Sequence, residues 1–109
     1  MTDIITGATG LIGNALVRQL LNDGRKVKIF IRKTSDTSCF KGMDIEKVYG
    51  DVLDVNSLIQ AFKNTENVYH LAGEISIMPG FNKNLYNTNL NGVKNAIEAC
   101  LKCGVKKLI

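Results

Sequence analysis

The sequence predicts an α/β fold built on a doubly wound parallel sheet, and two features of the chain carry this prediction. Short apolar segments with strand character alternate with amphipathic helical segments along all 109 residues, as in parallel sheets whose strands are joined by helices. Residues 6–13 read Thr-Gly-Ala-Thr-Gly-Leu-Ile-Gly, a glycine-rich turn between the first strand and the first helix. This combination is typical of the Rossmann type of fold, for which we expect the strand order 3-2-1-4-5.

The first part of the chain predicts two strands that are joined by a helix. Residues 3–6 form the first strand. An apolar stripe at i, i+4 and i+8 then predicts a helix whose inward face carries Ile12, Leu16 and Leu20. That helix is expected to end at Gly24, because glycine suits the position just after a helix. Residues 27–31 predict the second strand, and the polar residues 34–42 predict a loop that could include a short helix.

The middle of the chain repeats the pattern of strand, helix and strand. Residues 45–49 predict the third strand. A helix is expected over residues 56–63, with Asn56 as a candidate N-cap and an inward face formed by Leu58, Ile59 and Phe62. Residues 68–72 predict the fourth strand, which is expected to lie beside the first in the sheet.

The longest helix is expected over residues 82–102. Its spacing of apolar residues predicts an inward stripe made of Val93, Ala96, Ile97, Cys100 and Leu101. Gly104 ends the helix, and residues 105–109 begin a fifth strand. We therefore expect the sheet to be truncated after the start of strand five.

The glycine-rich turn has the chemistry of a cradle for the phosphates of a dinucleotide. Gly7 permits a tight turn, Gly10 lets backbone N–H groups approach a pyrophosphate, and Gly13 lets the helix lie close to the strand. The start of the helix adds unpaired N–H donors and about half a positive charge. The residues expected to bind the cofactor here are Gly7, Thr9, Gly10, Leu11, Ile12 and Gly13. The alternative is an ordinary turn between a strand and a helix.

The two-residue spacing between successive glycines resembles the extended short-chain dehydrogenase/reductase family. This family includes NAD(P)-dependent epimerases and dehydratases and the dihydroflavonol-reductase-like enzymes. Later segments agree in the expected order, at residues 30–32, 50–52, 70–73, 89–92 and 98–100. The resemblance implies that residues 1–109 are the amino-terminal part of a single NAD(P)-binding Rossmann domain that is incomplete at its C-terminus.

The end of the second strand points to NADP as the cofactor. Folds that prefer NAD place an acidic residue there for the ribose 2′-hydroxyl, whereas a basic residue accommodates a 2′-phosphate. This chain has Arg32 and Lys33 there, followed by Thr34 and Ser35. Asp36 keeps NAD open as the alternative, and Arg32 and Lys33 could also be solvated residues at a strand end.

The ends of strands three and four are expected to complete the cofactor site. The resemblance implies that Asp51 accepts a hydrogen bond from the adenine amino group and that the backbone of Val52 flanks the base. Asp51 could instead cap a turn. After strand four, the small residues of the segment Leu71, Ala72 and Gly73 allow the backbone to run against the cofactor ribose. His70 is expected to be a packed strand residue rather than a catalytic one.

Asn89 is the candidate for a supporting role near the active site. It lies four residues before Val93, on the stripe that the long helix is expected to turn inward. A buried amide must find hydrogen-bond partners. The resemblance implies that this asparagine helps to order the site of catalysis, and the alternative is an ordinary helix residue.

The chain lacks the catalytic pair that the resemblance implies, a tyrosine acid/base with a lysine four residues later. Its three tyrosines are followed at the fourth position by Leu53, Gly73 and Leu90. We therefore expect no catalytic residue in this chain and no activity from it alone. Three functions remain open: part of an NADP-dependent oxidoreductase that reduces a carbonyl of a small molecule, an NAD-dependent nucleotide-sugar epimerase or dehydratase, and an NAD(P)-sensing regulatory protein without chemistry.

Composition argues against several other classes of function. The net charge of +4 comes from scattered residues with no basic run longer than two, so we expect no nucleic-acid partner. No segment approaches the ~20 apolar residues of a membrane span, and the start resembles no signal peptide, so we expect a cytoplasmic protein. Cys100 and Cys103 have the C-x-x-C spacing but no second ligand pair, so no metal is expected. The sequence leaves the oligomeric state open.

Overall fold

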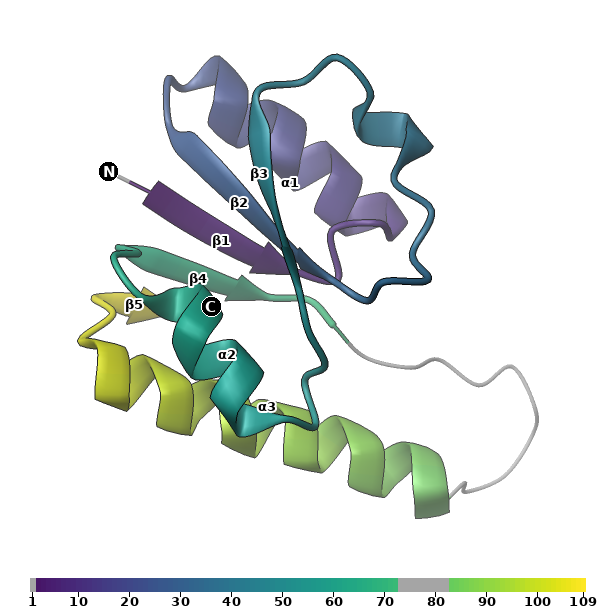
Figure 1. The fold of residues 1–109 in the computed structure, drawn as a ribbon, viewed down its shortest axis with the longest axis vertical. Coiled ribbons are helices and arrows are strands. Elements are labelled where there is room, and N and C mark those ends of the chain that lie inside the picture. The colour runs from purple at the N-terminus through teal and green to yellow at the C-terminus, as the bar shows by residue number, and fades with distance from the viewer. Residues whose placement is uncertain (1, 73–82) are drawn as a thin grey trace.

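The computed structural model describes residues 2–72 and 83–109, with the side chains of residues 83–88 left out of the description. Five parallel strands form one sheet in the order β3-β2-β1-β4-β5 (Figure 1), which confirms the predicted topology. The strands are β1 (Thr2–Thr6), β2 (Lys26–Ile31), β3 (Ile45–Tyr49), β4 (Asn67–His70) and β5 (Lys107–Leu108). The helices are α1 (Leu11–Asn22), the short 3-10 helix η1 (Ser38–Phe40), α2 (Val55–Phe62) and α3 (Lys83–Cys103).

Helices cover both faces of the sheet and bury one apolar cluster on each side. Neighbouring residues of β1 point to opposite faces, so that Ile5 packs with α1 and Ile4 packs with α2 and α3. Figure 1 shows α2 and α3 lying together on one side of the sheet and α1 on the other. The covering helix changes face between the two halves of the sheet, and β1 lies at this switch point. Ligands of open α/β sheets bind at the strand ends of such a point.

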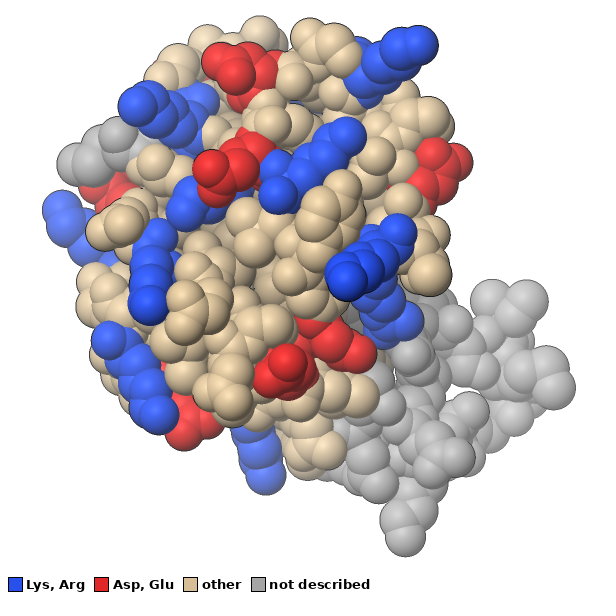
Figure 2. All heavy atoms as spheres, in the orientation of Figure 1, with Lys and Arg blue, Asp and Glu red and all other residues tan. Residues whose placement is uncertain are grey.

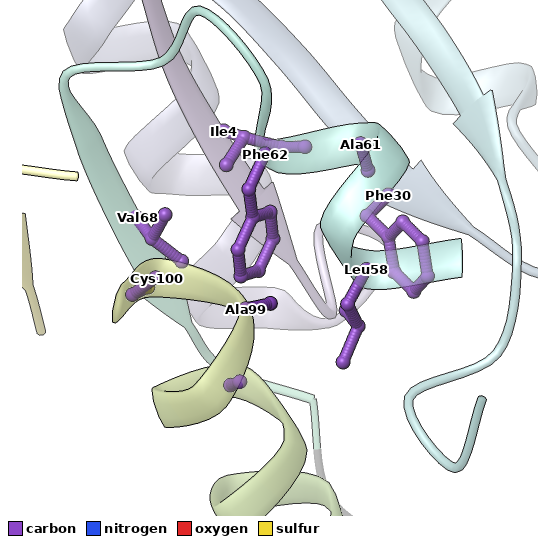
Figure 3. Close-up of a cluster of buried hydrophobic side chains, with 9 residues drawn as sticks. Ile4, Phe30, Leu58, Ala61, Phe62, Val68, Ala99 and Cys100 are labelled. Atoms are coloured by element: carbon purple, nitrogen blue, oxygen red, sulfur yellow. The ribbon is translucent and has the colours of Figure 1, made fainter. Parts of the chain in front are cut away.

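The cluster on the α2 and α3 side combines large side chains from one helix with small ones from the other (Figure 3). Phe62 and Leu58 of α2 are fully buried, and they face Ala96 and Ala99 of α3, which are also fully buried. Because small residues let two segments approach closely, α3 lies tightly against α2 and the sheet.

The predicted inward stripe of α1 is confirmed at Leu20 and wrong at Ile12. Gly13, Val17 and Leu20 are its buried residues, whereas Ile12 is 72% exposed and Leu16 is half-buried. The predicted inward position of Ile12 is therefore wrong. The physical reason is Gly13, whose missing side chain lets the start of the helix pack against the backbone of Gly7 and Ala8, so that the face with Gly13 and Val17 turns inward.

The predicted N-cap of the second helix is also corrected. Asp54, and not Asn56, caps α2, because an Asp54 carboxylate oxygen accepts a hydrogen bond from the backbone N–H of Asn56 at 3.1 Å. Within α2 the buried residues are Leu58, Ala61 and Phe62, while Ile59 packs against them from a half-buried position.

The predicted inward stripe of the long helix is correct in part. Ala96 and Cys100 are buried as expected. Val93, Ile97 and Leu101 are 42%, 44% and 79% exposed, so their predicted burial is wrong. Small residues form the packed face of α3 because the side chains of α2 already fill the space between the two helices. The larger apolar residues therefore lie on another face.

A polar network joins the amino-terminal ends of β1, β2 and β4, at the opposite end of the strands from the glycine-rich turn. Arg25 donates to the fully buried carboxylate of Asp3, with 2.9 Å between Nε and Oδ2, and to Glu66 Oε1 at 2.9 Å. Asn67 Nδ2 donates to Asp3 Oδ1 at 3.0 Å. The hydrogen bond from Arg25 holds the pKa of Glu66 below its ordinary value. These hydrogen bonds compensate the buried Asp3 carboxylate, whose burial without partners would cost free energy.

Charges of both signs are mixed on the surface. On the face drawn in Figure 2, lysine and arginine side chains are spread out with acidic side chains between them. No helix of the described residues is long and apolar enough to cross a membrane.

Candidate cofactor-binding site

The glycine-rich turn and the first turn of α1 form a loop of backbone donors at the end of β1. Gly7 has a φ of +73°, a left-handed conformation that favours glycine, and its carbonyl accepts a hydrogen bond from the N–H of Gly10 at 3.2 Å. Gly10 is the N-cap of α1, and no side chain caps this helix end. The N–H groups of the first helical turn have no partner within the helix, and they lie at the positive end of its dipole.

Two of the three glycines are required by packing inside the protein, and one is not. A Cβ on Gly7 would lie 2.6 Å from the N of Ala72, and a Cβ on Gly13 would overlap the backbone of Gly7 and Ala8. A Cβ on Gly10 would meet only the Gly7 oxygen, at 3.5 Å, which is an ordinary contact. Protein packing thus leaves the space above Gly10 open, as a cradle for an anionic group requires.

A cavity of about 610 Å³ opens beside this loop at the carboxyl ends of the strands. It collects residues from the ends of β1, β2, β3 and β4 and from α3. Of the sequence-predicted residues, those that line it are Gly7, Thr9, Gly10, Leu11, Ile12, Gly13, Arg32, Val52, Leu71, Ala72 and Asn89. Lys33 and Asp51 do not line it, and Gly73 lies outside the described residues.

The seam between β1 and β4 forms one wall of the cavity and is held by side-chain as well as backbone bonds. The backbone N–H of Ala72 donates to Thr6 Oγ1 at 3.1 Å, and Thr6 Oγ1 lies 2.8 Å from His70 Nδ1. The Thr6 hydroxyl thus accepts from Ala72 and is also hydrogen-bonded to the His70 ring, where the tautomer of the imidazole decides which group donates. Burial lowers the pKa of His70, which favours the neutral form of the ring. This places His70 in a structural contact behind the cavity wall.

Among the described residues that line the cavity, Arg32 is the one with a charged side chain. It lies just beyond β2 and is exposed, and Ser35 lines the cavity beside it. Ser35 Oγ accepts from the Arg32 N–H at 3.2 Å, and the Ser35 N–H donates to the Arg32 carbonyl at 3.0 Å. The two residues therefore form a compact turn that can present both a guanidinium and a hydroxyl to one anion.

Asp36, the acidic alternative near this strand end, is engaged in a local turn. One of its carboxylate oxygens accepts from the Ser38 N–H at 3.0 Å, and this backbone hydrogen bond lowers the pKa of Asp36. Asp36 does not line the cavity.

The loop after β3 forms the opposite wall. Gly50 and Val52 line the cavity, and an added Cβ on Gly50 would lie 2.6 Å from the ring of Phe30. The Asp51 side chain turns to the loop itself, because its Oδ1 accepts from the Leu53 N–H at 2.9 Å. An adenine contact of Asp51 stays a prediction.

Sequence reasoning missed several residues that the fold brings to the cavity. These residues are Phe30, Ile31, Ser35, Gly50 and Gly92. Gly92 was detectable from its place in the motif that carries Asn89, and Ser35 from its position beside Arg32. Phe30 and Gly50 come together only through the pairing of β2 with β3.

Among the described residues, no three His, Cys, Asp or Glu side chains gather in a way that could hold a metal ion. Cys100 is buried, and burial raises the pKa of its thiol to about 11. A protonated thiol is a poor nucleophile and a poor metal ligand.

Known proteins are similar to this chain in both sequence and fold. The model of the NAD dependent epimerase/dehydratase family matches residues 4–109. The chain is 38% identical to sterol demethylase protein B of Methylococcus capsulatus, over all of this chain and 33% of that protein. It is 32% identical to a ceramide reductase of Caulobacter vibrioides, over 96% of this chain and 32% of that protein. The chain thus spans about a third of the length of these curated relatives.

A solved structure from the same group aligns along almost the whole chain. The UDP-glucose 4-epimerase of Thermus thermophilus, in complex with NAD, superposes with a TM-score of 0.84 and 27% identity. The alignment covers 99% of this chain and 36% of the epimerase. The family match along the chain, the strand order and the glycine-rich loop agree, and this protein belongs to the NAD-dependent epimerase/dehydratase family.

Proposed function

We propose that this chain is the NADP-binding portion of an oxidoreductase that reduces a carbonyl of a small molecule by hydride transfer. The observation that carries the proposal is the position of Arg32, which lines the same cavity as the glycine-rich loop. The loop suits the pyrophosphate that all dinucleotide cofactors share. Arg32 and Ser35 suit a group that only NADP has, the 2′-phosphate of the adenosine ribose.

The charge at the cavity favours NADP over NAD. A guanidinium can donate two hydrogen bonds to one phosphate, and hydrogen bonds to charged groups contribute about 1.5–3 kcal/mol. This corresponds to roughly a ten- to hundredfold preference for the phosphorylated ligand. The carboxylate that could bind the 2′-hydroxyl of NAD instead is that of Asp36, which is engaged with Ser38.

In this proposal, the parts of the cofactor follow one another along the sheet. The pyrophosphate would lie at Gly10 and the first turn of α1, the 2′-phosphate at Arg32, and the base beside Val52. When bound, the nicotinamide cofactor supplies the hydride. The residues of this chain would bind and orient it. Asn89 lines the cavity together with Leu71 and Ala72, which follow β4, and would support the nicotinamide side.

The relatives support an oxidoreductase-type function in general, and their names offer both candidates. Ceramide reductase, at 32% identity, carries reduction in its name. The NAD-bound UDP-glucose 4-epimerase is less similar, at 27% identity, and it supports the second candidate, an NAD-dependent nucleotide-sugar epimerase or dehydratase. A sensing protein without chemistry would use the same cavity, and an assay of activity in the longer protein would separate it from both enzymes.

Calorimetry with two small ligands tests the choice of cofactor. The chain should bind 2′,5′-ADP at least tenfold more tightly than ADP, and Arg32→Glu should abolish that preference. Lys26→Glu is the matched control, since it makes the same charge change at the other end of β2. Equal affinities of the unmodified chain for the two ligands would reject NADP, and an unchanged preference in Arg32→Glu would reject the role of Arg32.

A further inference from the structure

Asn95 is a polar residue of α3 whose contact the sequence did not reveal. It is half-buried, and its Nδ2 donates a hydrogen bond of 2.9 Å to the carbonyl oxygen of Val52. Val52 lies in the loop between β3 and α2, so the bond joins residues 43 positions apart. Val52 lines the cavity, whereas Asn95 does not.

The Val52 side chain lies beside Gly92, one turn earlier on the same helix. A Cβ added to Gly92 would lie 3.3 Å from Val52 Cγ2, which is tighter than an ordinary contact. The missing side chain of Gly92 therefore leaves room for Val52 next to α3, and Asn95 supplies the hydrogen bond to its carbonyl oxygen. Gly92 lines the cavity beside Val52, so this junction of loop and helix is itself a section of the wall.

The rest of the loop is fixed by its own residues and by the first turn of α2. Asp51 Oδ1 accepts from the Leu53 N–H, and the Ser57 hydroxyl of α2 lies 2.9 Å from the carbonyl oxygen of Asp51 and 2.7 Å from that of Asp54. The side-chain bond to the Val52 carbonyl comes from Asn95, on a different element. Without this donor, a partly buried carbonyl would lose a hydrogen bond and Val52 would lose its link to α3.

The order of the strands assigns this wall to one part of the cofactor. The glycine-rich loop follows β1 and Arg32 follows β2, and Val52 follows β3, the next strand outward. A dinucleotide whose pyrophosphate lies at β1 and whose 2′-phosphate lies at β2 carries its adenine on the β2 and β3 side. We propose that Asn95 is a positioning residue that sets the adenine-binding wall of the cavity by holding Val52, an inference that rests on the proposed dinucleotide function.

Replacing the amide donor tests this role at constant size. Asn95→Asp removes the Nδ2 donor and places an acceptor against the Val52 carbonyl. Asn91→Asp makes the same change one turn earlier on α3, at an exposed position that does not line the cavity. Binding of ADP and of inorganic pyrophosphate to the 109-residue chain is followed by NMR titration, and stability is measured by urea unfolding.

We expect Asn95→Asp to weaken ADP binding about tenfold, as loss of one hydrogen bond and its alignment implies, and to leave pyrophosphate binding unchanged. Asn91→Asp should bind both ligands as the unmodified chain does. Equal ADP affinities of the two variants would overturn the inference, and so would a parallel loss of ADP and pyrophosphate binding, because a general structural effect would weaken both. If the unmodified chain binds neither ligand, the proposed dinucleotide function itself fails.

Discussion

Gly10→Ala is predicted to separate ligand binding from stability at the glycine-rich loop. The φ and ψ of Gly10, −74° and 171°, are allowed for alanine, and the new Cβ would meet only the Gly7 oxygen at 3.5 Å. Alanine is a poorer N-cap than glycine, which lowers the free energy of unfolding by about 0.5–1 kcal/mol. Alanine also reduces the conformational entropy of the unfolded chain, which raises the free energy of unfolding by about 0.4–1 kcal/mol. The free energy of unfolding should therefore change by less than about 1 kcal/mol.

Binding should respond to Gly10→Ala much more strongly than stability does. The methyl group would occupy the space into which a pyrophosphate fits, and loss of one charge-assisted hydrogen bond weakens affinity about ten- to hundredfold. Gly7→Ala is the matched comparison, since its φ of +73° and its 2.6 Å approach to Ala72 should cost at least about 2 kcal/mol of stability.

Urea unfolding followed by circular dichroism gives the stabilities, and calorimetry with ADP gives the affinities. An ADP affinity of Gly10→Ala equal to that of the unmodified chain would refute an open phosphate cradle above Gly10, and so would a loss of stability as large as that of Gly7→Ala.

Two further predictions concern the helix cap and the single histidine. Asp54→Ala should lower the free energy of unfolding by about 1 kcal/mol, whereas Asn56→Ala should leave it within about 0.5 kcal/mol, because Asp54 provides the capping oxygen; equal losses in urea unfolding would argue against this assignment. Burial lowers the pKa of His70 in the folded state below 6.5, so its contribution to stability is complete above pH 6.5 and is lost as the pH falls toward the folded pKa. His70→Asn should therefore lose less stability than the unmodified chain between about pH 7.5 and 5.5, and identical pH profiles would show that His70 is not buried as a neutral ring.

The sequence was sufficient to predict the sheet, because strand order follows from few rules. Alternating strands and helices with short connections leave few topologies, and the glycine-rich turn marks β1 as the central strand. Helix faces were harder to predict. In α3 the packed face carries Ala96 and Ala99, while Val93 and Ile97 are more hydrophobic and yet exposed. Hydrophobicity alone cannot show that Phe62 fills the interface and leaves room only for small residues.

In the candidate site, too, some residues were predictable from the sequence and others depend on packing. Gly7, the motif residues from Thr9 to Gly13, and Arg32 at a strand end were predictable from spacing, and the structure brings them to one cavity. The contact of Asn95 with Val52 depends on how α3 packs against a loop 43 residues away, and no local pattern marks it. Asp54 and Asn56 are both good capping residues, and the prediction chose Asn56, because only the backbone geometry distinguishes the two.

Mapping of 2′,5′-ADP on the amide resonances of the 109-residue chain tests the proposed dinucleotide site most directly. The ligand should cause saturable shifts at Leu11, Ile12 and Gly13, where the helix donors meet the pyrophosphate, and at Arg32 and Ser35, where the 2′-phosphate binds. An absence of saturable shifts at millimolar ligand, or shifts confined to the opposite edge of the sheet around Asp3 and Arg25, would contradict a dinucleotide site at this cavity.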